Sequence, residues 1–212
     1  LLGRARVYRH RIGIRGHGID RLWSMPTRPR QRRDACTGVR HRMFETPTGA
    51  FYVVLDADGM IEAGWRDMLR DFGGTGRTHD SLGEEVPGLL PDLCARIILA
   101  MDGRRVDFDD VPTPSGTGFQ RTVWNVTRGI GPGSTATYGE LAARIGRPGA
   151  ARAVGQAMRR NRLPMVIPCH RIIGAGDSGG FGGERAGTSR WTTIKTALLA
   201  AERDGRAQKS SG

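Results

Sequence analysis

Two short segments with helical spacing, joined by a tight connection of arginine, proline and glycine, constrain the fold of this chain more than any other feature. They cover residues 137–146 and 150–161. Two short helices with such a connection are typical of a helix-turn-helix unit. The early face of the second segment is nearly all small, including Ala151 and Gly155, with Arg152 among them. The small residues favour close approach to another surface, and ordinary packing against a neighbouring helix is an equal alternative.

An apolar stretch, residues 163–167, follows the helix-turn-helix segment and predicts a buried strand. It leads directly into Pro168, Cys169, His170 and Arg171. A cysteine thiolate is a reactive nucleophile, and a nearby imidazole lowers the pKa of a thiol. Because adjacent side chains rarely face each other, His170 would act through a water or a kinked backbone. An isolated Cys-His pair is usually a coincidence, so this pattern alone leaves the function open.

The net charge of the 212 residues is +12, which by itself suggests a nucleic-acid partner. The charge is unevenly distributed: residues 1–43 carry +10, residues 44–112 carry −8 and residues 113–212 carry +10. Only the third block coincides with patterned sequence. A polyanionic partner is therefore expected for that block alone.

Residues 1–42 are rich in arginine and show neither helical nor strand periodicity. They fit either a disordered basic arm that touches phosphates or an over-extended or processed start, because Met43 stands where patterned sequence begins. We favour the second interpretation. No apolar stretch of about 18 residues is present, so no transmembrane helix is expected. The three scattered cysteines are too few for a disulfide framework, and a reduced, cytoplasmic compartment is expected.

Residues 43–112 predict a small N-terminal α/β domain. Strands are expected over 50–55 and 60–65, a helix over 93–101 and a further short strand at 106–108. Cys94 falls on the apolar face of the expected helix, which favours a buried structural role.

A linker with two prolines and two glycines, residues 111–118, leads into a mainly helical C-terminal domain, 113–205, followed by a tail, 206–212. Thr117 is a candidate N-cap for a helix that ends at Gly129. This domain contains the helix-turn-helix and the candidate active-site cysteine. The expected fold class is therefore α+β.

The most specific pattern is Arg152-Ala153-Val154-Gly155, then Asn161, then Ile167-Pro168-Cys169-His170-Arg171. It resembles the signature of the O6-alkylguanine-DNA alkyltransferases, also named methylated-DNA–protein-cysteine methyltransferases. Dense similarity to this family covers residues 117–202, and looser similarity reaches back to Thr46. Further agreement lies in Phe119-Gln120, Val123-Trp124, Thr137-Tyr138-Gly139-Glu140-Leu141-Ala142, Gly180-Phe181-Gly182-Gly183 and Leu198-Leu199-Ala200-Ala201-Glu202.

The resemblance implies direct repair of DNA. The helix-turn-helix would enter the minor groove and extrude the alkylated guanine, because its O6 atom lies inside the duplex. Arg152 would fill the vacated position in the base stack. Tyr138 would crowd the phosphate and donate its hydroxyl toward guanine N3. The implied DNA-contacting residues are Arg152, Tyr138, Ala151, Gly155 and Arg159.

The resemblance also implies the chemistry. Cys169 would attack the alkyl carbon in a single displacement, with His170 as a base acting through water and Glu202 orienting the imidazole. Asn161 would brace the turn before the cysteine segment, and Tyr138 completes the implied catalytic set. The implied substrate-binding residues are Met158, Ile172, Phe181, Gly182 and Lys195.

The thioether product is not readily reversed, so one molecule would repair one lesion, without a cofactor or a metal. The implied partner is double-stranded DNA that contains O6-alkylguanine, with O4-alkylthymine as a second candidate lesion. We expect a monomer with no obligate protein partner and no membrane association.

The chain departs from the family pattern at three places. Arg162 follows Asn161 where the family has proline, and Phe181 stands where tyrosine is common. The segment 184–193 is longer than the usual spacing before Lys195.

Two other functions would also use a helix-turn-helix of this kind. An alkyltransferase-like protein that flags damaged bases carries another residue in place of the cysteine, so Cys169 argues against it. A helix-turn-helix transcriptional regulator would read the major groove, whereas the second helical segment offers few long polar side chains before Arg159.

Overall fold

The computed structural model describes residues 38–69, 78–176 and 190–210 of the chain. All of them belong to one compact unit that spans residues 34–212.

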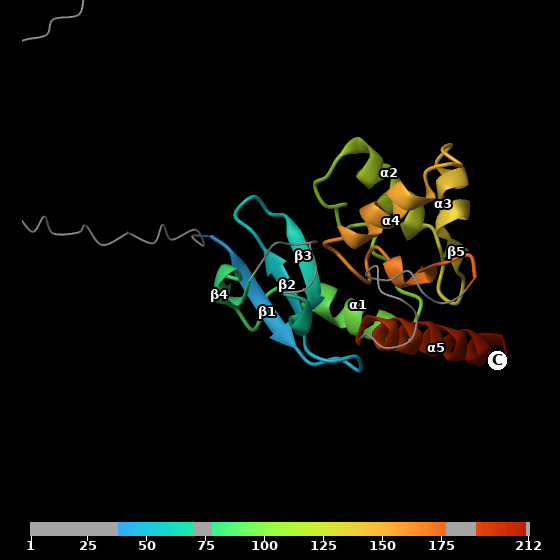
Figure 1. Cartoon of the computed structure of the whole chain (residues 1–212). Coiled ribbons are helices and arrows are strands. Elements are labelled where there is room, and N and C mark those ends of the chain that lie inside the picture. Colours follow the sequence, from blue (N-terminus) through green and yellow to red (C-terminus); the bar gives the residue numbers. More distant parts are fainter. Residues whose placement is uncertain (1–37, 70–77, 177–189, 211–212) are drawn as a thin grey trace, which may run out of the picture. The chain divides into compact units, whose positions relative to one another are not determined.

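The N-terminal part of this unit is a four-stranded sheet with the order β3-β2-β1-β4 (Figure 1). Neighbouring strands are antiparallel except for β4, which runs parallel to β1. The β2–β3 hairpin closes where the Asp56 carboxylate accepts the backbone N–H groups of Asp58 and Met60. The strands are β1 (Arg40–Phe44), β2 (Phe51–Leu55), β3 (Ile61–Trp65) and β4 (Glu84–Glu85), with short 3-10 turns at η1 (Arg66–Met68) and η2 (His79–Ser81).

Helix α1 (Pro91–Met101) begins with proline at its first position, where the missing N–H costs no hydrogen bond. Its apolar stripe, which includes Cys94 and Ile97, is buried, so the structural role expected for Cys94 is confirmed. The sheet, α1 and the helices that follow share one hydrophobic core, to which Phe51 and Trp124 both belong. One face of the sheet is therefore packed into the same core as the helices, and Tyr52 and Val54 on its other face belong to a second, smaller cluster with Leu69 and Leu82.

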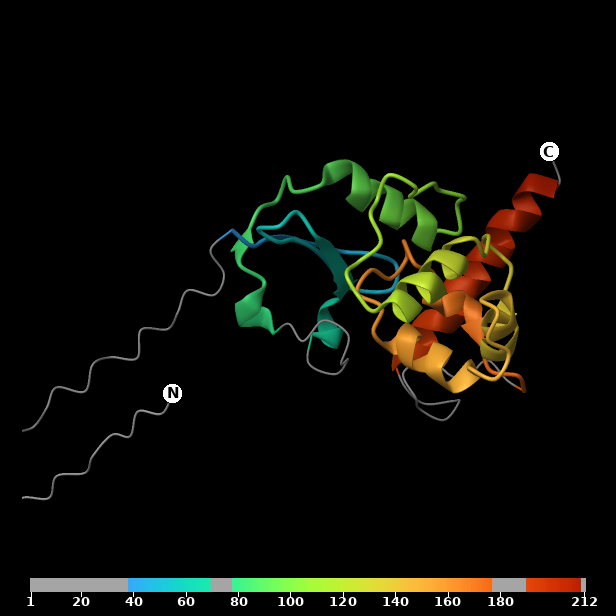
Figure 2. The same ribbon diagram turned by 90° about the horizontal axis from the view of Figure 1, so that it is seen from above.

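The C-terminal part is mainly helical (Figures 1 and 2). Thr117 caps α2 by accepting the N–H of Gln120, as predicted, and Thr137 caps α3 in the same way by accepting the N–H of Glu140. Helix α5 contacts both α1 and η3. The elements are α2 (Gly118–Arg128), β5 (Ala136–Thr137), α3 (Tyr138–Arg144), α4 (Ala151–Arg159), η3 (Cys169–Arg171), β6 (Ile172–Ile173) and α5 (Arg190–Ser210).

The structure confirms the α+β class and the two helices of the helix-turn-helix, and it corrects several sequence-based boundaries. The sheet begins at Arg40, because β1 pairs with β2 over its whole length, so the leader boundary predicted after residue 42 was wrong. Helix α5 continues to Ser210, into the predicted tail, and its first residues, 190–193, belong to the segment that was identified as an insertion.

Two predicted strands are absent from the described structure. Residues 106–108 form no strand, and the carbonyls of Asp107 and Phe108 accept hydrogen bonds from the guanidinium groups of Arg96 and Arg128. Residues 163–167 are buried, but they form a turn in which Met165 adopts a left-handed φ of 73°. None of the helices formed by the described residues is long and apolar enough to cross a membrane.

Candidate active site

Cys169 is the first residue of η3, directly after the buried turn at 163–167. The backbone N–H of Cys169 donates to the carbonyl of Ile167 over 2.8 Å, and the N–H of Arg171 donates to the carbonyl of Pro168 over 3.0 Å. The cysteine side chain is buried, with 5% of its residue surface exposed. The turn therefore holds the thiol in one position, within the interior.

The electrostatic surroundings of the Cys169 thiol act in opposite directions. Burial raises the pKa of this thiol above its ordinary value, because the thiolate loses its hydration. A hydrogen bond from the Asn161 side chain, the charge of Lys195 and backbone amide groups of Cys169 and His170 favour the thiolate and offset part of the rise. The thiol is thus a protonated group whose ionised form has preformed partners.

Asn161 ties the turn together. Its side-chain nitrogen donates to the carbonyl of Ile167 over 2.9 Å, and its side-chain oxygen accepts the N–H of Leu163 over 2.9 Å. With both hydrogen bonds made, the amide is fixed in orientation, and the same side chain acts to lower the pKa of the Cys169 thiol. The structure therefore places Asn161 between α4 and the cysteine, where the sequence predicted it.

His170 and Glu202 form a buried pair, with 2.8 Å between Nε2 of the imidazole and Oε1 of the carboxylate. Their residue surfaces are 2% and 1% exposed. Burial lowers the pKa of His170, because a charged imidazolium would be desolvated, although Glu202 acts against this effect. At neutral pH the imidazole is therefore neutral, and the ring nitrogen that faces Glu202 carries the proton.

Glu202 stays ionised because cationic and polar groups surround it. Nε and Nη2 of Arg171 lie 2.9 and 2.7 Å from Oε1, and the backbone N–H of Gly133 donates to Oε2 over 3.0 Å. Burial alone would raise the pKa of this carboxyl group, but the hydrogen bonds from His170 and Arg171, together with the charge of Arg171, outweigh burial and lower the pKa to about 2.

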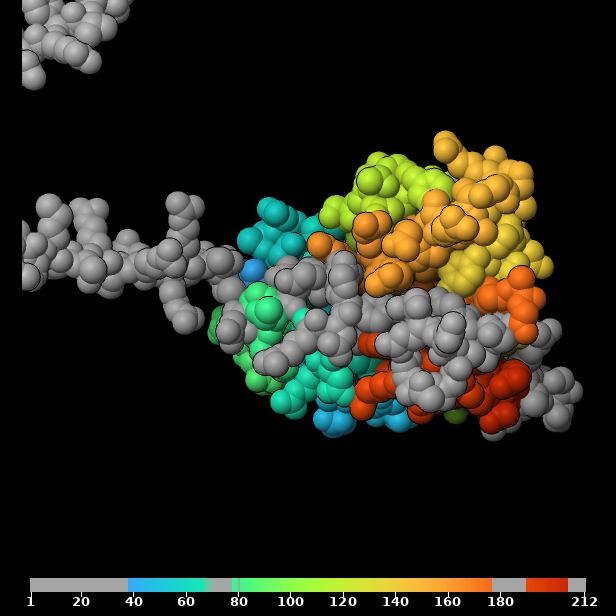
Figure 3. Space-filling model, in the orientation of Figure 1, coloured from blue at the N-terminus to red at the C-terminus, as the bar shows by residue number. Residues whose placement is uncertain are grey.

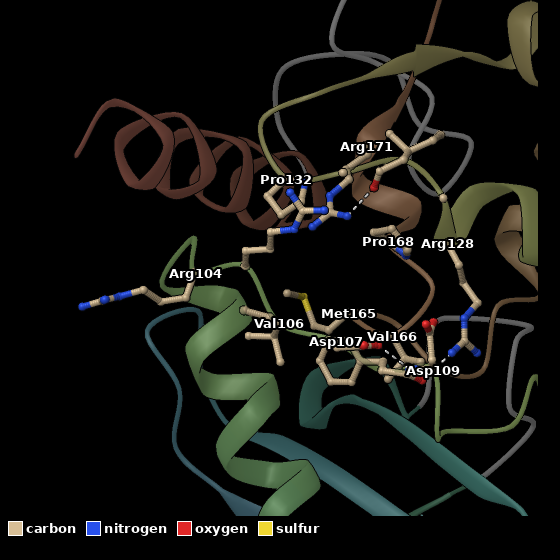
Figure 4. Close-up of a pocket in the computed structure, with 16 residues that line it drawn as sticks. Arg104, Val106, Asp107, Asp109, Arg128, Pro132, Met165, Val166, Pro168 and Arg171 are labelled. Atoms are coloured by element: carbon tan, nitrogen blue, oxygen red, sulfur yellow. Dashed lines mark hydrogen bonds between the residues drawn. The ribbon is translucent and has the colours of Figure 1, made fainter. Parts of the chain in front are cut away.

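Arg171 is the last residue of the cysteine-containing sequence pattern, and the sequence alone indicated no role for it. Its guanidinium also donates to the carbonyl of Ile130 over 2.5 Å, so it joins the α2–β5 connection to α5. A charged residue within a buried apolar stretch must have a partner, and this rule could have identified Arg171. Figure 4 shows Arg171 and Pro168 in the wall of a cavity of about 460 Å³, with Val106, Met165 and Val166 below them.

Tyr138 reaches the site because β5 and β6 pair in parallel, with Ala136 opposite Ile172 and Thr137 opposite Ile173. This pairing brings the first residue of α3 beside the segment that follows Cys169. Burial, and then the neighbouring Cys169, raise the pKa of the Tyr138 hydroxyl to about 12. The hydroxyl therefore remains a neutral hydrogen-bond donor throughout the physiological pH range.

Helix α4 presents the expected polar and small side chains at the surface. Arg152 and Arg159 are exposed, and Ala151 and Gly155 are partly exposed. A Cβ atom at Gly155 would lie 3.8 Å from the ring of Tyr138, so the small residue leaves room beside that ring. Figure 3 shows the surfaces of α3 and α4 adjoining on one face of the molecule. The opposite face of α4 packs inward.

Met158 lies on the inward face of α4, with 6% of its surface exposed, and its sulfur is 4.0 Å from Oγ1 of Thr127. Lys195 is buried on α5, and its Nζ donates to the carbonyl of Ile172 over 2.9 Å. Phe181 and Gly182 lie outside the described residues. Of the predicted substrate-binding set, the structure therefore places Met158, Ile172 and Lys195 in the interior, the last two joined by a hydrogen bond.

Among the residues that the structure describes, no three His, Cys, Asp or Glu side chains gather as metal ligands. The chemistry that the site offers is that of a buried thiol beside an Asn side chain, a Lys cation and a His–Glu pair.

Known proteins share this sequence and fold. Residues 118–204 match the family model described as the DNA-binding domain of 6-O-methylguanine DNA methyltransferase. A methylated-DNA–protein-cysteine methyltransferase of Methanosarcina acetivorans is 44% identical over 47% of this chain and 60% of its own length. The protein of the same name from Mycobacterium tuberculosis is 36% identical over 78% of this chain and 93% of its own length.

A crystal structure titled Mycobacterium tuberculosis OGT in complex with DNA is 30% identical to this chain, with a TM-score of 0.61. It matches 78% of this chain and 94% of its own length. The similarity therefore includes the N-terminal sheet as well as the region of the family model. On these findings, the chain belongs to the methylated-DNA–protein-cysteine methyltransferase family.

Proposed function

We propose that this protein repairs DNA by transferring the alkyl group of O6-alkylguanine to Cys169. The observation that carries this proposal is the position of the buried Cys169 thiol, which follows the turn held by Asn161 and lies next in sequence to the imidazole of the His170–Glu202 pair. A helix-turn-helix with exposed arginines belongs to the same compact unit. A nucleophile, a base and an orienting carboxylate are the elements that alkyl transfer requires.

The target atom lies inside the duplex, so the alkylated base must leave the stack. In our proposal α4 enters the minor groove, where the small side chains of Ala151 and Gly155 allow a close approach to the sugar-phosphate backbone. Arg152 occupies the space that the base leaves, Arg159 contacts phosphate, and Tyr138 crowds the phosphate of the extruded nucleotide. The exposure of Arg152 and Arg159 supports these roles.

The transfer is a single displacement. The sulfur of Cys169 attacks the alkyl carbon, the carbon–sulfur bond forms and the carbon–O6 bond breaks, and its electron pair stays on the guanine. The thiol proton passes through a water to the neutral His170, whose charge Glu202 stabilises. The hydroxyl of Tyr138 donates toward guanine N3 and reduces the charge on the leaving base. Asn161 holds the turn and the thiol.

The extruded base is held by residues on both sides of the cysteine. We assign this contact to the side chain of Met158, the carbonyl of Ile172, and Phe181 with the amide of Gly182. The Ile172 carbonyl already accepts from Lys195, and its second lone pair is available for the base. Lys195 thereby fixes one of the substrate-binding groups.

Because the thioether persists, one molecule repairs one lesion, with O4-alkylthymine as a second candidate substrate. The protein acts as a monomer and needs no cofactor. We place the boundary between the N-terminal and C-terminal domains at residue 113. Because the reaction consumes a free thiol, we also propose a reducing, cytoplasmic location.

A labelled-methyl assay tests the proposal. Wild-type protein should take up at most one labelled methyl group from duplex DNA with O6-methylguanine, and Cys169→Ser should take up none while it still binds that duplex. Cys94→Ser, at a buried cysteine of α1, is the matched control and should react like wild type. Lesion binding without uptake by the wild type would favour a damage-flagging protein. Neither lesion preference nor uptake would favour a transcriptional regulator.

A further inference from the structure

We propose that Glu62, on strand β3 of the N-terminal sheet, is a positioning residue for the Cys169 thiol and acts through Arg162 and Asn161. The inference rests on the proposed alkyl transfer for its functional meaning, but its contacts are independent of that function. It assigns a role in the reaction to the N-terminal sheet.

The sheet and the segment that leads into the cysteine turn are joined at two points, because two neighbouring residues of β3, Glu62 and Ala63, both bind Arg162. The backbone N–H of Ala63 donates to the carbonyl of Arg162 over 2.8 Å. The guanidinium of Arg162 donates to Oε1 of Glu62 over 3.0 Å. Because β3 is an edge strand, its outward N–H needs a partner outside the sheet, and Arg162 supplies one. Main chain and side chain thus fix the same residue.

The ion pair is strongly asymmetric in exposure. The side chain of Glu62 is 7% exposed and that of Arg162 is 37% exposed. A buried carboxylate requires a partner, because an unpaired charge in the interior is costly. The ion pair with the buried Glu62 carboxylate therefore contributes to holding the Arg162 side chain in place. The restraint falls on the residue immediately after Asn161.

The next step leads from Arg162 to the thiol. Asn161 precedes Arg162 in the chain, and its hydrogen bonds to the carbonyl of Ile167 and the N–H of Leu163 hold the turn that leads into Cys169. Hydrogen bonds weaken steeply as their distance and angle depart from the optimum. A small displacement of residue 162 therefore weakens the hydrogen bonds of Asn161 and shifts the turn that positions the Cys169 thiol.

The positioning role of the Glu62–Arg162 pair is tested by alkylating the full-length protein with iodoacetamide at a series of pH values. The rate at each pH is followed by the mass of the peptide that contains Cys169. Glu62→Gln keeps the shape of the side chain and removes its charge, and Arg162→Gln removes the partner. Each substitution should move the alkylation profile to higher pH and slow the reaction at neutral pH by about two- to tenfold, equivalent to one hydrogen bond. The double variant should slow no more than the slower single variant, and Arg162→Lys should restore part of the rate.

Asp67→Asn is the matched control. It breaks a second ion pair between the sheet region and α5, with 2.7 Å between Asp67 and Arg190, whose side chains are half exposed. Its alkylation profile should match wild type. The inference is overturned if Glu62→Gln and Arg162→Gln lower the unfolding temperature and leave the profile unchanged, or if Asp67→Asn shifts the profile equally. If Glu62→Gln does not fold, the comparison of Arg162→Gln with Arg162→Lys gives the same decision.

The same experiment separates this inference from the proposed function. Methyl transfer from O6-methylguanine DNA is measured on the same samples. If the variants show a shifted iodoacetamide profile but the wild type accepts no methyl group, the alkyl transfer is contradicted and the positioning role stands. Normal methyl transfer by wild type, with profiles that coincide among the variants, would contradict the positioning role alone.

Discussion

The imidazole of His170 lies 2.8 Å from the carboxylate of Glu202, although the two residues are 32 positions apart and on different elements. Arg171 contacts the same carboxylate oxygen. The ionised carboxylate accepts a hydrogen bond from Nε2–H of the imidazole, so Nδ1 carries the lone pair. The pair therefore leaves the neutral imidazole with one unprotonated ring nitrogen, as the proposed role of His170 as a base requires.

Glu202→Gln should slow methyl transfer while the fold is retained, because the amide no longer stabilises the imidazolium that forms during the reaction. The loss should be roughly tenfold or more, since a hydrogen bond between two charged groups is replaced by a neutral one. Single-turnover rates at several pH values measure it. A rate identical to wild type at every pH would exclude the orienting role.

The low pKa of Glu202 also predicts how the free energy of unfolding changes in acid. Its pKa falls from 4.5 to about 2 on folding, so its stabilisation is complete above pH 4.5 and is lost as the pH falls toward 2. The change corresponds to at most about 3 kcal/mol. Urea unfolding between these pH values should therefore show a steeper loss of stability in wild type than in Glu202→Gln. Parallel curves would contradict the low pKa.

Arg152→Ala should weaken repair of duplex lesions more than reaction with the free base O6-methylguanine, because the arginine acts only when a base leaves the stack. Arg104→Ala removes an equally exposed positive charge from the segment after α1 and is the control for net charge. Rates with both substrates measure the difference. An equal loss on duplex and free base would show that Arg152 has another role.

Tyr138→Phe should slow transfer by about tenfold, the equivalent of one lost hydrogen bond, with little change in binding to undamaged DNA. The ring, which lies beside Gly155, is kept and only the donor is removed. Because the pKa of the hydroxyl is about 12, the ratio of wild-type to variant rates should stay constant between neutral pH and pH 9. A ratio that changes between neutral pH and pH 9 would mean that the Tyr138 hydroxyl ionises within this pH range.

Gly103→Ala should destabilise the protein by more than about 2 kcal/mol. Gly103 has a φ of +75°, and a Cβ atom there would lie 2.0 Å from the carbonyl oxygen of Ala201 on α5. The turn after α1 and the helix that carries Glu202 would have to separate. Gly118→Ala, where an added Cβ meets no atom within 4 Å, is the control, and its free energy of unfolding should be unchanged or slightly higher.

Local signals in the sequence predicted much of the C-terminal part. The cap at Thr117 and the spacing of the two helices were predicted because each depends on residues within a few positions of one another. The prediction of a strand over 163–167 was wrong, because hydrophobicity indicates burial and says little about backbone shape. The left-handed φ of Met165 and the hydrogen bonds of Asn161 decide that shape.

Contacts between residues that are far apart in the sequence could not be predicted from local patterns. Glu62 and Arg162 are 100 positions apart, and neither has a neighbour in the sequence that marks it as one of a pair. The pairing of His170 with Glu202 was expected only through the resemblance to a known family. The role of Arg171 in holding Glu202 was missed, because its partners become adjacent only when α5 packs against η3.

The measurement that tests the central claim most directly is the mass of the protein and its peptides after incubation with duplex DNA containing one O6-methylguanine. We predict one added methyl group, located on the peptide that contains Cys169, and unmodified guanine in the recovered DNA. A methyl group on another peptide, or restored guanine with no mass change in the protein, would contradict the account.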